Sequence, residues 1–402
     1  FDYKKDFPLL AANDVAYLDN SATTQKPACV IEAERDFYLK HNANPLRGLY
    51  DLAMQATDIY EDGRVAVQKF INAKSEQEII FTRNTTESLN LVAYSYGLAN
   101  LKPGDEIVTT IMEHHSNMLP WRMVAQQTGA VVKYIERAVD GSISDEAIDA
   151  AVTEKTKIVA MAEVSNVLGR LNPIAKAISA AHKVGAVAVI DAAQSAPHMA
   201  IDVQKMDADF LAFSGHKMLG PMGIGVLYGK KALLEAMPPF LSGGEMISFV
   251  SRDGQEYAPL PHKFEAGTVN AAGAAGLHAA IEYINSIGFE VIEAREAALT
   301  KLAFDAMQNI PGVHIIGGKT AEEHKGILTF TVEGVHPHDI AAILDADGVN
   351  IRAGNHCAQP LLDHLCTGAT ARASLAFYNS AADVERFINS LSTIRERMGY
   401  GR

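Results

Sequence analysis

Short runs of apolar and β-branched residues recur from about residue 78, separated by polar turns and by stretches with a helical period. The strand-like runs cover residues 78–83, 106–111, 131–135, 157–163, 186–190, 210–213 and 224–228. Helical patterns such as 88–99 and 174–183 lie between several of them. Strands that alternate with helices predict an α/β fold, with a mainly parallel sheet covered by helices on both faces.

The pattern changes after about residue 270. Two helical stretches, 271–287 and 294–309, are followed by sparser strands at 313–316, 326–332 and 349–352. This order predicts a second, smaller α+β domain. We therefore expect a large domain over residues 15–270 and a small domain over 271–402, joined by the N-terminal residues 1–14.

The chain has 402 residues, 48% of them hydrophobic, and a net charge of −13. This composition is typical of a soluble protein, and its acidity disfavours nucleic acid and anionic membranes as partners. The apolar run 184–193 is too short to span a bilayer, and the first ten residues carry four charges, unlike a signal peptide. Three cysteines without a C-x-x-C pair argue against a disulfide framework and a structural zinc site. We expect a cytoplasmic protein.

Polar side chains follow five of the predicted strands. They are Thr85-Thr86-Glu87, Glu113-His114-His115, Ser165-Asn166, Asp191 with Gln194, and Ser214-Gly215-His216-Lys217. In an open α/β sheet, ligands bind beyond the carboxyl ends of the strands. The convergence of five such ends predicts a functional site there.

Lys217 and Asp191 are charged residues that follow predicted buried strands, where burial of a charge without a partner is unfavourable. Burial of Lys217 after its strand would lower the pKa of the amine, and such amines form covalent bonds with carbonyl groups. The alternative is a side chain that reaches to solvent. The carboxylate of Asp191 needs a cationic partner at that depth, and the nitrogen of a pyridoxal ring is one such partner. Capping of a following helix is the alternative for Asp191.

Phosphate and ring contacts have candidates at the other strand ends. Thr85 and Thr86 stand where a helix begins, which favours a phosphate, although ordinary helix capping is the alternative. Ser214 and His216 could complete the phosphate site. One of the adjacent histidines 114 and 115 could stack on a flat ring and move protons, or the two could form a core pair. Since no second cluster has ligand spacing, we expect no metal.

A second centre lies near the C-terminus, in Arg352-Ala-Gly-Asn-His-Cys357. The neighbouring Arg352 and His356 favour the thiolate form of Cys357, which is the nucleophile; a small buried hydrophobic residue is the alternative. Cys29 and Cys366 lack such a loop. Arg372 interrupts an apolar run, where it could bind a carboxylate through two hydrogen bonds or form a structural salt bridge.

Together these motifs resemble the class V aminotransferase family of fold type I pyridoxal-phosphate enzymes, and more closely the SufS-type (group II) cysteine desulfurases. The resemblance covers nearly the whole chain. It runs through Tyr17-Leu-Asp-Asn-Ser-Ala, Thr85-Thr-Glu, Glu113-His-His-Ser-Asn, Ser165-Asn-Val-Leu-Gly, Asp191-Ala-Ala-Gln, Ser214-Gly-His-Lys-Met-Leu-Gly-Pro, Phe264-Glu-Ala-Gly-Thr, Arg352-Ala-Gly-Asn-His-Cys-Ala and Ala371-Arg-Ala-Ser. Their order and spacing, more than any single motif, carry the resemblance.

The resemblance implies pyridoxal 5'-phosphate as cofactor and L-cysteine as substrate. It implies cofactor binding by Thr85, Thr86, His114, Asp191, Gln194, Ser214, His216 and Lys217, and by Thr268 from the other subunit of a homodimer. It implies substrate binding by Asn166, Arg352 and Arg372, proton transfer by Lys217 and His114, and sulfur capture by Cys357. Loop 265–268 shows no evident role within its own subunit, which agrees with a role across a dimer interface.

The activity that the resemblance implies is conversion of L-cysteine to L-alanine with a persulfide on Cys357. The sulfur would pass to a small acceptor protein (SufU- or SufE-like) for iron–sulfur cluster assembly. A selenocysteine lyase would use the same residues, and a related class V aminotransferase would need no thiol. A scaffold without activity is a third alternative, which the presence of Lys217, Asp191 and Cys357 together disfavours.

Two positions depart from the pattern of these desulfurases. Asn355 replaces the first histidine of the usual Gly-His-His-Cys, and Leu46, in Pro45-Leu-Arg47-Gly, replaces the histidine of Val-His-Arg-Gly. We expect both positions to lie near the mouth through which sulfur leaves. The departures therefore concern partner choice and persulfide reactivity more than cofactor chemistry.

Overall fold

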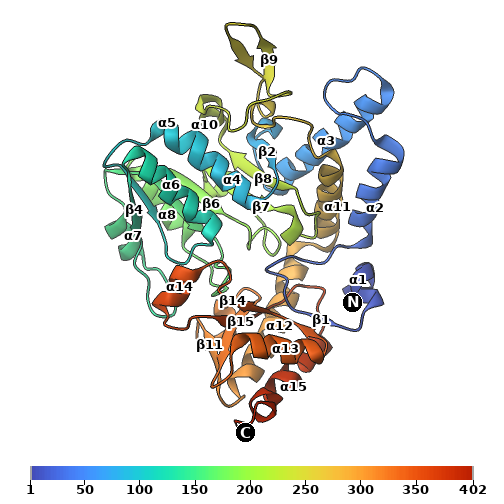
Figure 1. Cartoon of the computed structure of the whole chain (residues 1–402), viewed down its shortest axis with the longest axis vertical. Coiled ribbons are helices and arrows are strands. Elements are labelled where there is room, and N and C mark those ends of the chain that lie inside the picture. Colours follow the sequence, from blue (N-terminus) through green and yellow to red (C-terminus); the bar gives the residue numbers. More distant parts are fainter. Residues whose placement is uncertain (1, 401–402) are drawn as a thin grey trace.

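The computed structural model describes residues 2–400 as a large upper part and a small lower part, each built on its own sheet (Figure 1). The large part holds a seven-stranded sheet in the order β2-β8-β7-β6-β5-β3-β4. Its strands are β2 (Ile79–Thr82), β3 (Glu106–Thr109), β4 (Val131–Tyr134), β5 (Thr156–Ala162), β6 (Val187–Asp191), β7 (Phe210–Ser214) and β8 (Gly225–Gly229). Each predicted run overlaps one of these strands, and the bounds differ by at most two residues.

Only β8 runs antiparallel to its neighbours in this sheet, β2 and β7, so the predicted mainly parallel sheet is confirmed. The reason is the short connection: residues 215–224 hold one turn of 3-10 helix, η6 (Gly215–Lys217), and no crossover helix. A parallel return needs a crossover of a dozen or more residues. The chain therefore turns back directly after β7 and places Lys217 in the turn.

Helices cover both faces of the large sheet, as the alternation of buried residues along each strand requires. On β6, Ala188 and Ile190 face one core, with α3 (Asp51–Phe70), α8 (Ile174–Lys183) and α11 (Ala271–Ile287). Val187 and Val189 face the other core, with α4 (Thr85–Leu91) and α6 (Leu119–Thr128). The predicted helix 88–99 begins earlier, at Thr85, and continues as η4 (Val92–Gly97), a π-helix, and α5 (Leu98–Asn100).

The small part holds a four-stranded antiparallel sheet in the order β11-β12-β15-β14. Its strands are β11 (Val313–Ile316), β12 (Ile327–Val332), β15 (Thr370–Ser374) and β14 (Arg352–Gly354), and its helices are α12 (Phe289–Gln308), α13 (Pro337–Ala346) and α15 (Ala381–Arg397). The predicted strand 349–352 is two strands, because β13 (Val349–Asn350) pairs with β1 (Ala16–Tyr17) and β14 pairs with β15. The predicted helix 294–309 begins earlier, directly after Gly288.

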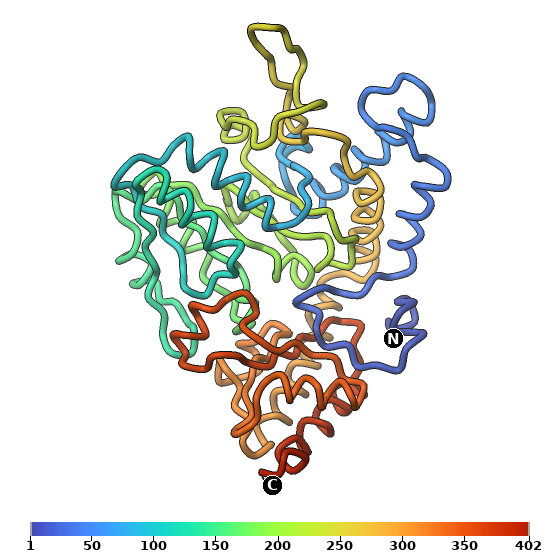
Figure 2. The backbone as a smooth tube through the Cα atoms, in the orientation of Figure 1, coloured from blue at the N-terminus to red at the C-terminus, as the bar shows by residue number. Residues whose placement is uncertain are grey.

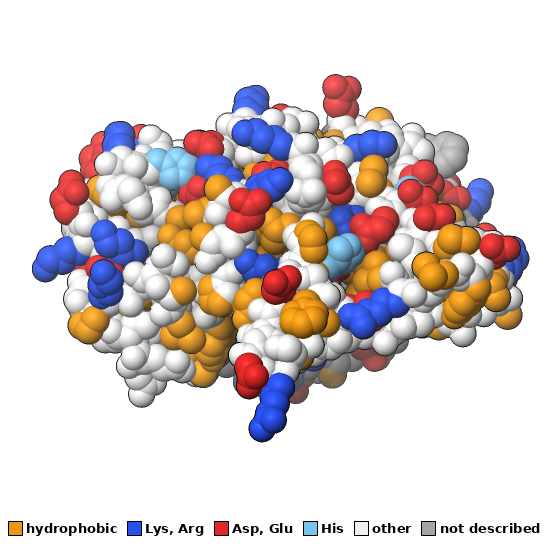
Figure 3. Space-filling view, turned by 90° about the horizontal axis from the view of Figure 1, so that it is seen from above, with side chains coloured by type: hydrophobic (Ala, Val, Ile, Leu, Met, Phe, Trp, Pro, Cys, Tyr) orange, Lys and Arg blue, Asp and Glu red, His pale blue; other side chains and the backbone are white. Residues whose placement is uncertain are grey.

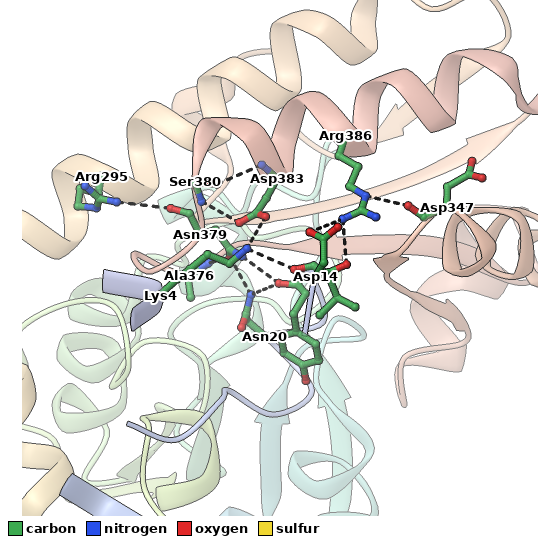
Figure 4. Close-up of polar contacts among 12 residues, drawn as sticks. Lys4, Asp14, Asn20, Arg295, Asp347, Ala376, Asn379, Ser380, Asp383 and Arg386 are labelled. Carbon is green, nitrogen blue, oxygen red and sulfur yellow. Dashed lines mark hydrogen bonds and ion pairs between the residues drawn. The ribbon is translucent and has the colours of Figure 1, made fainter. Parts of the chain in front are cut away.

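The N-terminal segment runs along the boundary between the two parts (Figure 2). Lys4 forms an ion pair of 2.7 Å with Asp383 of α15 (Figure 4). The Asn20 side-chain amide donates to the Ser374 carbonyl at 2.8 Å. The predicted domain boundary at residue 270 stays a prediction. Helix α11, directly after it, packs against α3 and α2 (Ala28–Asp36) of the large part.

A buried ion pair joins three elements of the large part. Arg64 of α3 is fully buried, and its two terminal nitrogens contact the two carboxylate oxygens of Glu265 at 2.7 and 2.8 Å. The same carboxylate accepts hydrogen bonds from the Phe81 backbone N–H in β2 and from the Tyr60 hydroxyl, both at 2.7 Å. The expectation that loop 265–268 has no role within its own subunit is therefore wrong for Glu265, which anchors the loop.

Loss of this carboxylate should destabilise the fold strongly. We expect Glu265→Ala to lower the free energy of unfolding by about 3–5 kcal/mol, because the buried Arg64 guanidinium then keeps only the partly exposed Glu61 as an ionic partner. Urea unfolding of the full-length chain measures this. Asp305→Ala is the control, since it breaks an exposed pair with Lys301 and should cost at most about 1 kcal/mol. A loss for Glu265→Ala no larger than the control's would contradict the assignment.

Candidate active site

A cavity of about 200 Å³ lies between the strand ends of the large sheet and the loops of the small part. It gathers the predicted site residues except Thr268. These are Thr85, Thr86, His114, Asn166, Asp191, Gln194, Ser214, His216, Lys217, Arg352, Cys357 and Arg372. Side chains from distant stretches of the chain therefore share one volume, because the carboxyl ends of parallel strands meet at one edge of the sheet.

Lys217 is the last residue of η6, directly after β7. Among the described residues its amine makes no hydrogen bond and no ion pair, so it is free to react. Burial lowers the pKa of Lys217 to about 8, although the negative charge of Asp191 opposes this shift. A larger fraction of this amine than of an ordinary lysine amine is therefore neutral, and nucleophilic, near neutral pH.

Asp191 is the last residue of β6 and is buried. One carboxylate oxygen accepts a hydrogen bond from the Ala193 backbone N–H at 2.9 Å, within a turn. No helix begins in residues 192–199, so the alternative that Asp191 caps a helix is wrong. Burial raises the pKa of Asp191, while the Ala193 N–H and the Lys217 charge oppose the shift. A cation placed against this carboxylate would satisfy it.

The two histidines of the 113–115 motif point to different surroundings. The Ser116 backbone N–H donates to Nδ1 of His114 at 3.1 Å, so in the neutral ring Nε2 carries the proton. Burial, and then the charge of Lys217, lower the pKa of His114 to about 3, which keeps the ring neutral. His115 lies outside the cavity, where its Nε2 accepts from the Gln359 backbone N–H at 3.2 Å. The geometry favours His114 for a ring contact.

Hydroxyl groups gather where a phosphate would bind. The Ser214 hydroxyl lies 2.6 Å from the Thr85 hydroxyl and accepts from the Thr85 backbone N–H at 2.8 Å. The Thr86 hydroxyl lies 2.8 Å from that of Ser116. Burial lowers the pKa of His216 to about 4, so its ring is a neutral hydrogen-bonding group here. Thr268 is exposed and lies outside the cavity of its own chain.

Two arginines of the small part meet one aspartate at the cavity wall. Arg372 of β15 lies 3.5 Å from one oxygen of Asp19, and Arg352 of β14 lies 3.8 Å from the other. Arg372 also donates to the Asn166 backbone carbonyl at 2.8 Å, while its Nε has no partner among the described residues. Burial lowers the pKa of Arg372 to about 10, which leaves it charged at neutral pH. Arg372 therefore forms the structural salt bridge and retains donor capacity, while its role in binding a carboxylate stays a prediction.

Cys357 is exposed, on a loop that the rest of the cavity holds in place. His356 and Cys357 both have positive φ angles, +50° and +54°, which non-glycine residues rarely adopt. The loop is held by the Asn166 side chain, which donates to the His356 carbonyl at 2.7 Å, and by the His115 backbone N–H, which donates to the Cys357 carbonyl at 2.7 Å. Contacts with the large part therefore keep this strained loop at the cavity mouth.

The two departures from the desulfurase pattern lie in different places. Asn355 is exposed and lies two residues before Cys357, as expected. Leu46 and Arg47 line no part of the cavity. Arg47 forms an ion pair of 2.7 Å with Glu245, near the hairpin of β9 (Ile247–Val250) and β10 (Gln255–Tyr257). Within one subunit Leu46 does not line the cavity, and its expected place near the sulfur mouth stays a prediction.

Sequence reasoning assigned no role to three residues that organise the cavity. Glu113 is fully buried and accepts hydrogen bonds from the Thr110 hydroxyl at 2.7 Å and the Ala162 N–H at 2.8 Å, which ties the His114 loop to β5. Burial raises the pKa of Glu113 to about 8. Asp19 holds the arginines, and Ser116 orients His114. All three lie within the quoted motifs. The one signal in the sequence was the carboxylate of Glu113 at the end of an apolar strand, which indicates a buried polar group that needs partners.

The cavity has chemical groups that fit pyridoxal phosphate. Asp191 offers a buried carboxylate to the ring nitrogen, and Lys217 offers an unbonded amine to the aldehyde. The side-chain oxygen of Gln194 is buried without a partner among the described residues, at a place where a ring hydroxyl would supply a donor. Among residues 2–400, no group of three or more His, Cys, Asp and Glu side chains is placed to hold a metal ion, and no helix is long and apolar enough to cross a membrane.

The fold and this cavity define a pyridoxal-phosphate-dependent enzyme. A sequence profile of the class V aminotransferases matches residues 16–387, and the chain belongs to this family. It is 50% identical to a probable cysteine desulfurase of Halalkalibacterium halodurans, over 99% of this chain and 98% of that protein.

Two solved structures share the fold over almost their whole length. The apo cysteine desulfurase of Thermococcus onnurineus has a TM-score of 0.95 and 42% identity, and the S-sulfonic acid form of the Escherichia coli cysteine desulfurase CsdA has a TM-score of 0.92 and 41% identity. Each covers 98% of this chain and is itself covered to 98%. The predicted fold type is confirmed.

The Lys217 amine should titrate well below an ordinary lysine. In the full-length chain stripped of cofactor, we expect its acetylation rate to rise with pH through an apparent pKa of about 8. Asp191→Asn should move this pKa lower, because the negative charge of Asp191 raises it. Peptide mass spectrometry after brief labelling measures both, with exposed Lys40 as the reference. The description of a buried Lys217 amine would be contradicted if its acetylation rate depended on pH as that of Lys40 does, or if Asp191→Asn left that dependence unchanged.

Proposed function

We propose that this protein is a pyridoxal-phosphate-dependent cysteine desulfurase that converts L-cysteine to L-alanine and holds the sulfur as a persulfide on Cys357. The observation that carries the proposal is the joint placement of Lys217 and Cys357 on one cavity, which Arg372 also lines as an anchor. A related aminotransferase needs the lysine and the arginine but has no use for a thiol. The names of the relatives at 50% and 42% identity support the same activity.

The substrate carboxylate would bind to Arg372. Its guanidinium is charged and keeps Nε without a protein partner among the described residues, and Arg352 and the Asn166 side chain lie on the same cavity wall. Asp19 lies too far from Arg372, at 3.5 Å, for a short charge-assisted hydrogen bond, so a substrate carboxylate has room to compete. Binding there directs the amino group of cysteine toward Lys217 and its sulfur toward Cys357.

The proton steps belong to Lys217 and His114. The bound cofactor supplies an electron sink, which Asp191 sustains by keeping the ring nitrogen protonated. Lys217, with its pKa lowered to about 8, is suited to remove the proton from the α-carbon and to return one later. His114 is neutral and carries its proton on Nε2, so it can donate a hydrogen bond without adding a positive charge.

Cys357 would perform the sulfur transfer as a nucleophile. Its thiolate attacks the sulfur of the substrate, a sulfur–sulfur bond forms, and the bond between that sulfur and the β-carbon breaks. The bonding electron pair stays with the carbon skeleton, which takes up a proton and leaves as L-alanine. The net change is L-cysteine plus the Cys357 thiol to L-alanine plus the Cys357 persulfide, which needs no external oxidant.

Cys357→Ser should separate this role from cofactor chemistry. The variant should bind cofactor and cysteine, yet its alanine release should fall by at least about 10²-fold, because the nucleophile is lost. In the unmodified chain, brief exposure to cysteine followed by alkylation should add one sulfur atom to the Cys357 peptide. Cys366→Ser, which removes another exposed thiol, is the control and should keep normal turnover.

Two outcomes would contradict the proposal. Normal desulfuration by Cys357→Ser would favour an aminotransferase-like activity, and persulfide on Cys29 or Cys366 would place the sulfur elsewhere. A selenocysteine lyase is the second candidate, and rates on cysteine and selenocysteine separate the two.

The desulfurase group and the sulfur acceptor are inferred from the sequence motifs and from the exposure of Cys357. We place the enzyme with the SufS-type (group II) desulfurases of the cytoplasm, supplying sulfur for iron–sulfur cluster assembly, because the motif set from Tyr17 to Ser374 follows that pattern. Exposed Cys357 is accessible to the thiol of a small acceptor protein of SufU or SufE type. Alanine release with and without such an acceptor tests this step.

A homodimer would complete the cofactor site with Thr268. The Glu265 anchor holds the loop rigidly while Thr268 itself stays exposed. Large apolar side chains are also exposed near the upper end of the molecule, among them Leu49, which is 94% exposed, Tyr38 and Leu39. Figure 3 views this end, where apolar side chains lie between charged ones. Burial of such side chains against a second copy would be favourable.

Thr268→Ala tests this arrangement. We expect the protein to sediment as a dimer, and the variant to lose pyridoxal phosphate roughly tenfold more readily, since one charge-assisted hydrogen bond to phosphate is lost. Its urea midpoint without cofactor should be unchanged. Thr393→Ala, on the exposed side of α15, is the control. A fully active monomer, or retention equal to the control's, would refute the role.

A further inference from the structure

The backbone carbonyl of His216, the residue before Lys217, accepts hydrogen bonds from three residues of segment 23–26. The Thr23 hydroxyl donates at 3.0 Å, and Thr24 donates through its backbone N–H at 3.1 Å and its hydroxyl at 3.2 Å. The Lys26 amine makes the shortest contact, at 2.8 Å. A carbonyl has two lone pairs, so the shortest donor takes the largest share of the bonding.

Lys26 has no other evident task. Its amine also donates to the Thr24 carbonyl at 2.6 Å, and no carboxylate among the described residues lies within ion-pair distance. Burial lowers the pKa of Lys26 to about 7, with the charge of Glu34 opposing the shift. Burial of a lysine away from a carboxylate is costly. The hydrogen bonds to the Thr24 and His216 carbonyls are therefore the features that account for its place, and only the second joins Lys26 to the Lys217 turn.

The same segment holds the far side of the Lys217 turn. The Leu219 backbone N–H donates to the Thr24 hydroxyl at 2.9 Å. Segment 23–26 thus binds the chain just before Lys217 and two residues after it, although it lies almost 200 positions earlier in the sequence. The turn itself is short, and the Met218 backbone N–H donates a hydrogen bond to the Gly215 carbonyl at 3.0 Å.

We propose that Lys26 is a positioning residue that sets the direction of the Lys217 side chain through the peptide between His216 and Lys217. Because that peptide is planar, a fixed carbonyl also fixes the orientation of the Lys217 N–Cα bond. The amine lies roughly 6 Å from its own Cα, so a backbone rotation of about 10° displaces it by about 1 Å. Misplacement on that scale can slow a reaction by about 10²-fold.

This inference rests on the proposed role of Lys217 in binding the cofactor aldehyde, and the experiment separates the two. Lys26→Met removes the donor and keeps the length of the side chain. In full-length chains stripped of cofactor, we expect covalent attachment of pyridoxal phosphate to Lys217 to be roughly tenfold slower than in the unmodified chain, since the Thr23 and Thr24 donors remain. Absorbance follows the rate, and borohydride trapping with peptide mass spectrometry locates the attachment.

Pyridoxamine phosphate distinguishes positioning from general damage, because it has an amine in place of the aldehyde and binds without the covalent bond. Its affinity should stay within about twofold in Lys26→Met. Lys4→Met is the matched control: it removes a partly buried lysine of the same N-terminal region, bound to Asp383 and the Val15 carbonyl, far from this turn. It should leave the attachment rate unchanged.

Lys26→Arg restores a cationic donor and should return the attachment rate to within about threefold of normal. Thr23→Val removes a second donor to the same carbonyl and should slow attachment less than Lys26→Met; it serves as the test if Lys26→Met does not fold. The inference is overturned by a normal rate in the tested variant, by an equal slowing in Lys4→Met, or by an equal loss of pyridoxamine phosphate affinity. Attachment to a lysine other than Lys217 in the unmodified chain would instead overturn the proposed function.

Discussion

The site depends on one electrostatic constraint: the Asp191 carboxylate and the Lys217 amine share a small, largely desolvated cavity without a direct ion pair. Burial shifts both pKa values toward the neutral forms, while each charge opposes the shift of the other. A protein that gained only stability from these residues would join them in a salt bridge. Keeping them apart leaves room between them for a flat, charged ligand that satisfies both.

Almost every other feature of the cavity serves to hold these two groups and their surroundings still. The short β7–β8 connection places Lys217 in a turn, and segment 23–26 fastens that turn from the far side. Glu113 ties the His114 loop to β5 through buried hydrogen bonds. Hydrogen bonds of this kind are strong in a buried setting, and they keep polar side chains in one arrangement.

The small part contributes the chemistry that distinguishes one reaction from another on this scaffold. Its sheet supplies Arg372 for a carboxylate, and its loop supplies the exposed Cys357. The loop has strained backbone at His356 and Cys357, which contacts with Asn166 and His115 maintain. Under the proposed function, sulfur transfer would depend on how the two parts of the chain meet, whereas cofactor binding would depend mainly on the large sheet.

Much of this was determined by the sequence alone. Periodicity located each strand of the large sheet, two helices to the residue, 174–183 and 271–287, and the polar strand ends that gather in the cavity. These features depend on local pattern and on the rule that parallel strands end together. Periodicity could not reveal the Asp19 contact with the arginines, the anchor at Glu265, the place of Leu46 or the contact of Lys26 with the His216 carbonyl. Each of these joins segments far apart in the sequence, and only the packing of the folded chain decides which buried polar groups become neighbours.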